Sequence, residues 1–470
     1  MKKKYIFITI LAFVAISYYY LHKSIGTNNS FLSKINQFMP NEVRLFLKET
    51  LFVFNNQKKL KKEIKKLKKD LAKAYSENNE ILNKIELFNF SQTSETNFKS
   101  NDFTYEEYEN LVLYKLGNRT YFEEFENNFF AITGNGTLLY SPIDKLNGKN
   151  FNLKKINSNF LSKLEKENSD VSVTGVLVKK NKMYLSYSAL KKENCHINAI
   201  VYGEINFEKI NFKEFFSTNE CSPSYTLSTG GALSNYKDNK ILITIGDWEH
   251  PEQFKKNSPQ NLKNFKGKII SINEETKAYE IISLGHRNQQ GVFYDSKNDI
   301  IFSTEHGPQG GDEININISP DSKNPKNYGW PISSYGEHYG YPDNEELHHK
   351  CKCPIREVYE AAPLNKSHKD FGFIEPLKNF TPSIGITQII KTEDFINKED
   401  KNIIYVASLG YDISEGDLSI HQFILSSKFE IEEHNIIPIG KRIRDIIYLK
   451  NINKILLSLN GSIGILGLNL

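Results

Sequence analysis

The sequence has little net charge, few cysteines and no visible internal repeat. Its 60 Lys and Arg residues nearly balance its 56 Asp and Glu residues, which leaves a formal net charge of +4. A charge this small over 470 residues gives no indication of a nucleic-acid partner. Hydrophobic residues make up 39% of the chain and aromatic residues 12%, enough for a large core. The length therefore allows one large domain with additional segments.

The four cysteines are Cys195, Cys221, Cys351 and Cys353. An even count suits an exported protein with disulfides. Cys195 and Cys221 flank a strand-like stretch, which favours a bridge between them. Cys351 and Cys353 are too close for an easy mutual disulfide. Because His348 and His349 lie just before them, a zinc site is the alternative for this pair.

The N-terminus resembles a membrane anchor. Lys2, Lys3 and Lys4 precede an apolar run from Tyr5 to Leu21, which is short for a membrane span. A signal peptide has the same layout of charge, and Ala15-Ile16-Ser17 offers a cleavage site. The tyrosines at 18–20 favour an uncleaved anchor over residues 1–25, because aromatic residues gather at membrane interfaces. Either alternative places the rest of the protein outside the cytoplasm, in the periplasm or at the cell surface.

A long helix is expected after a juxtamembrane segment at 26–56. Between residues 57 and 90, apolar residues recur at alternating spacings of four and three, with Asn78 in one core position. This heptad pattern predicts a coiled coil that makes the protein a homo-oligomer. The alternative is a single amphipathic helix that packs on its own domain. Residues 91–103 are rich in Ser, Thr and Asn and are interpreted as a linker.

Helical periodicity largely stops after residue 104. Short apolar or alternating runs follow instead, and most are separated by turns that contain Gly, Asn, Asp or Pro. Many hairpins in succession produce this pattern. We therefore expect an all-β domain over residues 104–470 whose strand edges are protected by closure into a ring.

The most informative stretch is residues 285–331. It contains Gly285-His286-Arg287-Asn288-Gln289-Gln290-Gly291, then Glu305-His306-Gly307-Pro308, Gly310-Gly311-Asp312-Glu313 and Asn327-Tyr328-Gly329-Trp330-Pro331. Glycines permit positive φ or a close approach of the backbone. Acidic side chains and carbonyls so close together suit a hard cation such as calcium.

The order and spacing of these motifs resemble the soluble quinoprotein glucose/sorbosone dehydrogenase family of aldose sugar dehydrogenase type. Gly230-Gly231 with the run 243–247, Phe380-Thr381-Pro382-Ser383 and Arg442-Ile443-Arg444-Asp445 extend the resemblance. It implies a six-bladed β-propeller that uses pyrroloquinoline quinone (PQQ) and calcium. The activity implied is oxidation of the C1 hydroxyl of a sugar by hydride transfer to the quinone.

The resemblance also implies roles for individual residues. Cofactor contacts fall on Arg287, Asn288, Gln290, Phe380, Arg442 and Arg444, with Arg287 also near the chemistry. Carbonyls of Gly307 and Pro308 hold the catalytic calcium, which acts as a Lewis acid. A second, structural calcium falls on Asp312, Glu313 and Tyr328. Arginines suit a cofactor that carries several carboxylates.

Three positions depart from the family pattern. The catalytic histidine is expected where this chain has Ser228, and a serine does not accept a proton near neutral pH without a base of its own. The arginine after the glycine pair is Ala232, and a lysine near the quinone is Gly410. His250 and His306 are candidate replacement bases. The chain is thus either a membrane-anchored quinone-dependent sugar dehydrogenase or a catalytically degenerate propeller that binds a carbohydrate or a protein partner.

Overall fold

The computed structural model describes residues 87–98, 103–110, 119–160, 172–192, 195–222, 228–248, 258–308, 310–336, 367–392, 402–410 and 417–468. The chain divides into two compact units, Met1–Lys84 and Ile85–Leu470, and all of these residues belong to the second. The predicted anchor, the juxtamembrane segment and nearly all of the predicted coiled coil lie outside the described residues, as do His250, Cys351 and Cys353. No helix within the described ranges is long and apolar enough to cross a membrane.

The described chain consists almost entirely of strands. Short 3-10 segments are η2 (Ile143–Asn147), η3 (Ser258–Gln260), η4 (Lys369–Phe371) and η6 (Lys450–Ile452). The strands are β1 (Leu87–Asn97), β2 (Phe103–Glu109), β3 (Thr120–Phe125), β4 (Asn128–Thr133), β5 (Leu138–Pro142), β6 (Asn150–Ser158), β7 (Val173–Lys179), β8 (Lys182–Lys192), β9 (Cys195–Glu204), β10 (Lys209–Ile210), β11 (Lys213–Ser217), β12 (Gly230–Tyr236), β13 (Lys240–Ile245), β14 (Lys268–Asn273), β15 (Tyr279–Leu284), β16 (Asn288–Asp295), β17 (Ile300–His306), β18 (Asp312–Ile318), β19 (Lys326–Asn327), β20 (Lys378–Phe380), β21 (Ile386–Thr392), β22 (Asn402–Ser408), β23 (Ser419–Leu425), β24 (Ile431–Pro438), β25 (Ile443–Leu449), β26 (Lys454–Leu459) and β27 (Ser462–Leu468).

Burial along the strands follows their hydrophobic pattern. In β6, Phe151, Leu153 and Ile156 are buried while the residues between them face solvent at least in part. Strand β22 is apolar at nearly every position and is buried along almost its whole length. Because successive side chains of a strand point to opposite faces, β6 has one covered face and β22 has two. The expectation of an all-β domain is confirmed.

These strands form five sheets. Four have the orders β11-β9-β8-β7, β12-β13-β14-β15-β19, β16-β17-β18-β20 and β21-β22-β23-β24. The fifth has the order β25-β26-β27-β2-β1-β6-β5-β4-β3, with β10 added beside β6. Most neighbouring strands are consecutive in the chain and antiparallel, as expected for a succession of hairpins.

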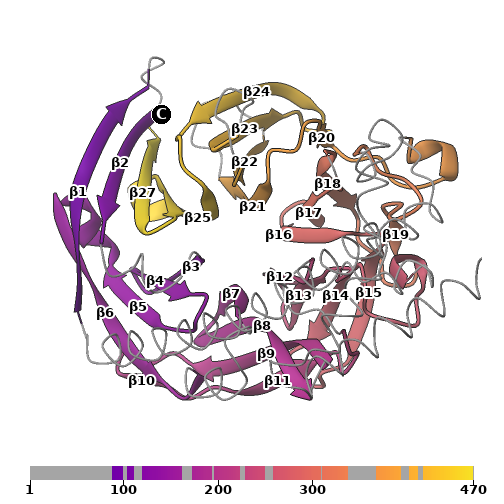
Figure 1. Ribbon diagram of the computed structural model, residues 1–470, viewed down its shortest axis with the longest axis horizontal. Coiled ribbons are helices and arrows are strands. Elements are labelled where there is room, and N and C mark those ends of the chain that lie inside the picture. Colours follow the sequence, from indigo (N-terminus) through magenta and orange to yellow (C-terminus); the bar gives the residue numbers. More distant parts are fainter. Residues whose placement is uncertain are drawn as a thin grey trace, which may run out of the picture. The chain divides into compact units, whose positions relative to one another are not determined.

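The sheets are arranged in a ring. Strand β3 packs against β7, β7 against β12, β12 against β16, β16 against β21, β21 against β25, and β25 again against β3. Figure 1 shows these strands nearest to the centre, with the later strands of each sheet further out. Radial sheets around a common centre make a propeller-like fold, which removes most free strand edges.

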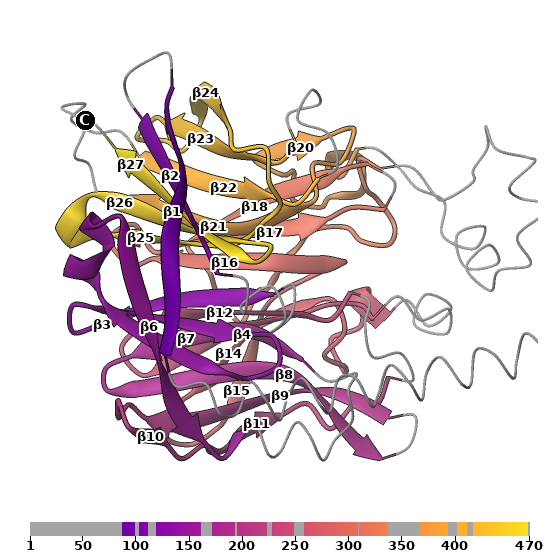
Figure 2. The same ribbon diagram turned by 60° about the vertical axis from the view of Figure 1, so that its left-hand side comes forward.

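The two ends of the domain close this ring together. Strand β2 pairs with β27 from Phe103↔Leu468 to Glu109↔Ser462. Strand β1 pairs with β2 along one part of its length and with β6 along another. Figure 2 shows β1 running beside β2 and β6. The first described strand therefore joins the last sheet of the ring to the first.

This start of the domain differs from the sequence prediction. Residues 87–97 form β1, where the end of the coiled coil and most of the linker at 91–103 were predicted. Phe88 and Phe90 are fully buried, and the Phe90 ring stacks on Phe151 at a centroid distance of 5.0 Å. The remaining residues of β1 are polar except Leu87, and their backbone groups are paired with β6 and β2. Backbone pairing, which side-chain composition does not reveal, makes this segment a strand.

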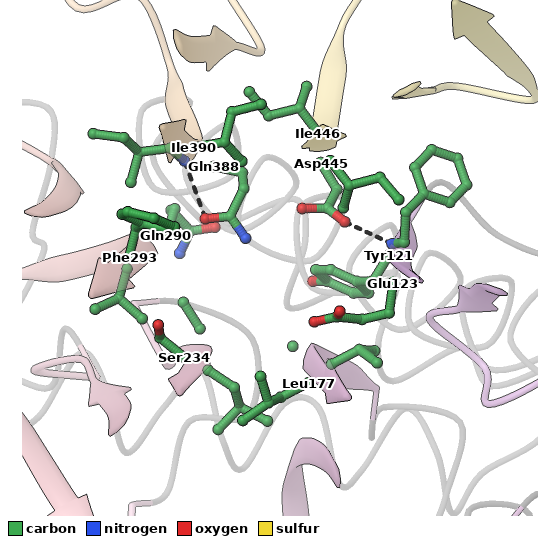
Figure 3. A pocket seen from close by; sticks show the side chains of 18 of the residues that line it. Tyr121, Glu123, Leu177, Ser234, Gln290, Phe293, Gln388, Ile390, Asp445 and Ile446 are labelled. Atoms are coloured by element: carbon green, nitrogen blue, oxygen red, sulfur yellow. Dashed lines mark hydrogen bonds between the residues drawn. The ribbon is translucent and has the colours of Figure 1, made fainter. Parts of the chain in front are cut away.

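The innermost strands enclose an axial cavity of about 280 Å³. Glu123, Asp445, Gln290 and Gln388 line it together with apolar side chains (Figure 3). The backbone N–H of Phe122 donates to Asp445 Oδ2 at 2.6 Å. Burial raises the pKa of Asp445 to about 7 and raises the pKa of Glu123 well above its usual range. The nearby Asp445 carboxyl group adds to the shift of Glu123.

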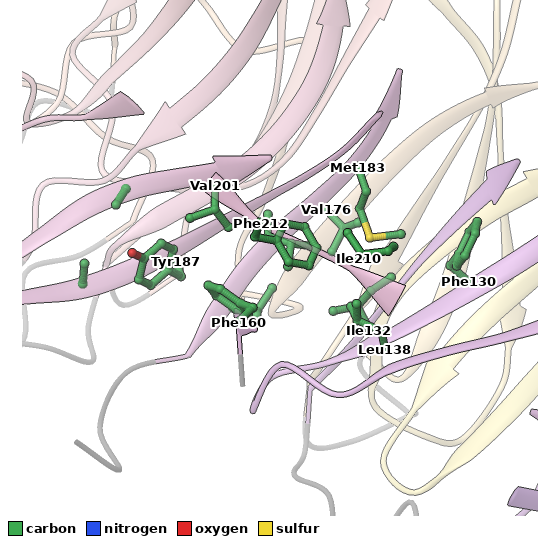
Figure 4. Close-up of a cluster of buried hydrophobic side chains, with 14 of the residues drawn as sticks. Phe130, Ile132, Leu138, Phe160, Val176, Met183, Tyr187, Val201, Ile210 and Phe212 are labelled. Atoms are coloured by element: carbon green, nitrogen blue, oxygen red, sulfur yellow. The ribbon is translucent and has the colours of Figure 1, made fainter. Parts of the chain in front are cut away.

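Hydrophobic side chains fill the space between neighbouring sheets. In Figure 4, side chains of β4 and β5 such as Phe130 and Leu138 lie near Val176 and Met183 of the next sheet. The predicted disulfide between Cys195 and Cys221 is confirmed. It ties the start of β9 to the segment that follows β11.

Candidate active site

The predicted site residues gather where the innermost strands begin. Ser228 lies just before β12, Arg287 just before β16 and Arg442 just before β25. Each sheet starts at the centre of the ring, so the first residues of these strands meet on one face. The hydrogen bonds described next connect these positions around that face.

Asn288 connects two neighbouring sheets. Its Oδ1 accepts a hydrogen bond from the backbone N–H of Gly230 at 3.3 Å. The same oxygen accepts one from Gln290 Nε2 at 2.9 Å, and Gln290 also lines the axial cavity. The structure thus brings Asn288 and Gln290 together with the Gly230-Gly231 turn, as the family pattern implies.

Ser228 occupies a tight turn beside that glycine pair. Its φ is +51°, its carbonyl accepts a hydrogen bond from Trp248 N–H at 3.0 Å, and it is 7% exposed. The Ser228 hydroxyl makes no hydrogen bond to any residue that the structure describes. Ala232, two residues into β12, is buried against the cavity.

Arg287 is buried and held in place on several sides. Its Nη1 donates to the His306 carbonyl at 3.1 Å, and its guanidinium lies 5.6 Å from the centre of the Trp330 ring. The Arg287 carbonyl accepts from Asp247 N–H at 2.8 Å, and Trp330 Nε1 donates to Asp247 Oδ2 at 2.8 Å. The sequence motif at 285–291 and the Trp330 motif therefore meet at one guanidinium.

Asp312 organises the Gly307-Pro308 loop. Its Oδ1 accepts from Gly307 N–H at 3.1 Å and from Ser383 Oγ at 2.9 Å, while its Oδ2 accepts from Ile386 N–H at 2.9 Å. His306 Nδ1 lies 3.7 Å from Asp312 Oδ1. Asp312 thereby joins the loop after β17 to the start of β21, and three hydrogen bonds occupy its carboxylate.

The predicted structural calcium cluster is divided in the structure. Glu313 and Tyr328 lie near each other, whereas Asp312, the preceding residue of β18, points to the other side of its strand. Glu313 Oε1 lies 3.2 Å from His368 Nε2, and the Tyr328 hydroxyl donates to Ile316 O at 2.9 Å. Over the residues described here, no group of three or more His, Cys, Asp or Glu side chains is placed to hold a metal ion.

A buried polar network beneath the site was not predicted. His286 is fully buried, with Nδ1 2.8 Å from Glu305 Oε2 and Nε2 2.8 Å from Ser283 Oγ. Burial lowers the pKa of His286 to about 3 and raises the pKa of Glu305 to about 8. His286 and Glu305 stand inside the motifs that the sequence singled out, so their positions could have been found but their partnership could not.

Phe380 belongs to the core rather than to an open site. It is 8% exposed and packs among the apolar residues between two sheets, with the His421 ring edge-on at a centroid distance of 5.3 Å. Strand β20 pairs with β18, which directs this side chain into the sheet interface. The predicted aromatic flank of the cofactor is therefore not formed by Phe380 in this structure.

Arg442 and Arg444 lie at the start of β25, on the face where the innermost strands begin. Arg442 Nη1 donates to the carbonyl of Gly410 at 3.0 Å. Burial lowers the pKa of Arg444 to about 10, and the positive charges of Arg119 and Arg442 contribute to this shift. Arg119 precedes β3 and was missed, because nothing in its local sequence indicates that β3 packs beside β25.

Comparison with known proteins agrees with this arrangement. A family model described as Glucose / Sorbosone dehydrogenase matches residues 168–462, well over half of the chain. The chain belongs to the glucose/sorbosone dehydrogenase family. The match includes all the predicted site residues, and Arg119 lies before it.

Individual relatives and solved structures are also similar to this chain. The aldose sugar dehydrogenase YliI of Escherichia coli K12 is 27% identical over 185 residues, covering 36% of this chain and 47% of the relative. The protein slr1608 of Synechocystis is 29% identical over 235 residues, covering 46% and 50%. The chain thus matches about half the length of these curated relatives. The soluble aldose sugar dehydrogenase of Escherichia coli superposes with a TM-score of 0.55 at 19% identity, over 74% of this chain and 95% of that chain. A crystal structure of a glucose dehydrogenase also has a TM-score of 0.55, at 20% identity, over 74% of this chain and 94% of that chain.

The glucose/sorbosone dehydrogenase pattern places a lysine at Gly410, but the structure leaves no room for one. A Cβ atom at Gly410 would lie 2.0 Å from Asp417 Cγ. The site does fit a ligand with several carboxylates. Arg444 Nε is buried without a hydrogen-bond partner, and two further arginines lie near it. The divided acidic cluster of Asp312 and Glu313 does not fit a structural calcium.

Proposed function

We propose that the protein is a quinone-dependent sugar dehydrogenase whose active site lies where the innermost strands begin. The observation that carries this proposal is the convergence of Arg287, Asn288, Arg442 and Arg444 on one face. They form two pairs from two different sheets, and the pairs lie more than 150 positions (442 − 288 = 154) apart in the sequence. A propeller needs no such set of guanidinium and amide groups for folding, and a carboxylate-rich quinone does need them.

We propose further that the propeller has six blades. Strands β3 to β6 form one blade of the ten-stranded sheet, and β25, β26, β27 and β2 form another. Strand β1 pairs with the outer strand of each and joins them. The other four sheets then supply one blade each. This division also explains why six innermost strands pack in a closed circle.

A bound quinone would supply the acceptor for the hydride that leaves the sugar C1 carbon. The role of Arg442 and Arg444 is to hold its carboxylates by charge-assisted hydrogen bonds. Asn288 orients it through the carboxamide that already spans two sheets. Gly307 and Pro308 carbonyls would hold a calcium ion, in a loop that Asp312 keeps folded.

A residue other than Ser228 must accept the proton of the sugar hydroxyl. His306 lies directly before Gly307, is partly exposed, and has Nδ1 3.7 Å from the Asp312 carboxylate. We assign this role to His306, with Asp312 beside its ring. His250, the other candidate base, lies outside the described residues.

A second function is favoured by one pair of observations. The Ser228 hydroxyl lacks an adjacent base in the described chain, and Asp417 fills the space that a lysine at 410 would need. A propeller with both departures could bind carbohydrate or a protein partner without catalysis. In either case the Cys195–Cys221 disulfide favours a location outside the cytoplasm.

The test is reduction of an electron-acceptor dye by purified protein supplied with PQQ, calcium and aldoses. We expect aldose-dependent reduction that falls about a hundredfold or more in His306→Gln, since general base catalysis contributes roughly 10²–10⁴. Lys369→Gln, an exposed change elsewhere, serves as the control. Binding of PQQ without any turnover would contradict the enzymatic function and favour the non-catalytic binding function.

A further inference from the structure

We infer that Arg119, which lies outside the family motifs, is a third anion-binding residue that acts with Arg442 and Arg444 on the carboxylates of the bound ligand. The inference rests on the proposed function, since it takes a polycarboxylate quinone as the ligand. It assigns a specificity-determining residue to the first sheet of the ring, which the sequence motifs leave without any role.

The fold fixes Arg119 beside Arg444. Arg119 immediately precedes β3, and β3 packs against β25, which carries Arg444. Phe122 N–H donates to Asp445 Oδ2 of β25 at 2.6 Å, and Ser458 Oγ of the next strand, β26, donates to Thr120 O at 2.7 Å. The position of Arg119 therefore follows from the closure of the ring.

The backbone and stem of Arg119 are also held locally. Gly134 N–H donates to the Arg119 carbonyl at 2.7 Å. A Cβ at Gly134 would lie 3.2 Å from Arg119 Cβ and 3.9 Å from its Cδ, so the aliphatic stem packs over a residue without a side chain. The glycine leaves the stem a fixed place on the site face, with the guanidinium near Arg444.

Tyr121 and Asp445 act on the charge of Arg444 from nearby. Within the chain that the structure describes, the side chains of Arg119 and Arg444 form no hydrogen bond or ion pair, and Arg444 Nε is buried. Asp445, the nearest acid in sequence, is bonded to Phe122 N–H, and burial raises its pKa to about 7. Burial lowers the pKa of Arg444, and the like charges of Arg119 and Arg442 add to that shift. A ligand carboxylate would satisfy both guanidinium groups.

Arg119 also compensates for a loss elsewhere on the same face. Gly410 stands where the family pattern has a cation, and Asp417 adds a carboxyl group at that position. Arg442 donates to the Gly410 carbonyl, so Gly410 and Asp417 lie beside the pair Arg442 and Arg444. Arg119 restores a positive charge on the opposite side of that pair.

The test measures binding of PQQ to the full-length protein by fluorescence quenching over a range of salt concentrations. Arg119→Met should weaken binding about ten- to hundredfold, the effect expected for one charge-assisted hydrogen bond, and should flatten the salt dependence. Arg119→Lys should give an intermediate loss, because it keeps the charge but not the fork. Lys240→Met removes a partly exposed cation paired with Glu280 and should leave binding unchanged. Melting temperatures of all variants check folding.

Each outcome decides between the inference and the proposed function. Equal PQQ binding by wild type and both Arg119 variants would overturn the inference and leave the proposed function standing. If wild type does not bind PQQ, benzene-1,3,5-tricarboxylate is titrated instead. Binding of that anion, weakened in Arg119→Met, would support the arginine site and reject the quinone. Binding of neither compound would overturn both.

Discussion

At the scale of single residues, the Asp417 side chain leaves no space for a side chain at Gly410. A side chain there would meet the Asp417 carboxyl group, with Cβ 2.0 Å from Cγ. We predict that Gly410→Lys lowers the free energy of unfolding by about 1–3 kcal/mol through overpacking. Asp417→Ala in the same chain should recover part of that loss, which a double-mutant cycle from denaturant melts would measure as coupling.

The control for this cycle is Gly148→Lys. Gly148 has a φ of −105°, and a Cβ there would lie no closer than 3.4 Å to its neighbours. This substitution should be nearly neutral. Independent, additive effects of Gly410→Lys and Asp417→Ala would contradict the steric interpretation.

The Asp445 carboxyl group should make stability depend on pH. Burial raises its pKa from 3.8 to about 7, so the folded protein holds a proton that the unfolded chain releases. The free energy of unfolding should therefore fall as pH rises from about 4 to 7, by on the order of a few kcal/mol. Asp445→Asn cannot ionise and should show a smaller fall when melts are recorded from pH 4 to 8.

Asp144→Asn provides the comparison for this experiment, because Asp144 is an exposed acid in η2. Its pH profile should match that of the wild-type protein. A profile of Asp445→Asn that coincides with wild type would show that Asp445 is ionised throughout and that its hydrogen bonds outweigh its burial.

At the scale of secondary-structure elements, β1 contributes more than its composition indicates. Phe90 is fully buried and stacks on Phe151 of β6. We predict that Phe90→Ala lowers the free energy of unfolding by about 3–5 kcal/mol, the usual cost of removing a buried aromatic side chain. Ser94→Ala, at an exposed position of the same strand, should change it by about 0.5 kcal/mol or less.

Thermal and denaturant melts of the full chain give both values. A loss near zero for Phe90→Ala would mean that β1 is not docked in solution. The segment 87–97 would then be the linker that its polar sequence implies. Equal losses for the two variants would point to a general weakness of the strand rather than to the aromatic stack.

At the scale of the whole molecule, the sequence predicts strands and motifs better than it predicts neighbours. Arg287 and Asn288 were assigned by the family resemblance, and their motif directly precedes a strand of clear pattern. Asp312 and Glu313 were assigned to one cluster, but alternation along β18 separates them. Phe380 was assigned to the cofactor by the same resemblance, and its packing against a neighbouring sheet is not visible in the local sequence. Distances across sheets depend on register and ring closure, which no local pattern records.

Arg119 is a site residue that the sequence did not predict, for the same reason. It stands before an ordinary strand, in a part of the chain that the family model does not match. Its neighbourhood is made by residues from the far end of the domain, through the packing of β3 on β25. A residue of this kind becomes visible only when the first and last sheets meet.

The pairing of β2 with β27 also affects the nascent chain during its synthesis on the ribosome. Synthesis runs at about 5–20 residues per second, and 353 positions (462 − 109) separate the end of β2 from the start of its partner. A nascent chain therefore carries an unmatched edge on β2 for roughly 20–70 seconds before the matching strand emerges. Strand β1 covers only the other edge during that interval. An exposed edge invites pairing with other chains, so we expect chaperones of nascent chains to bind this protein early and for most of its synthesis.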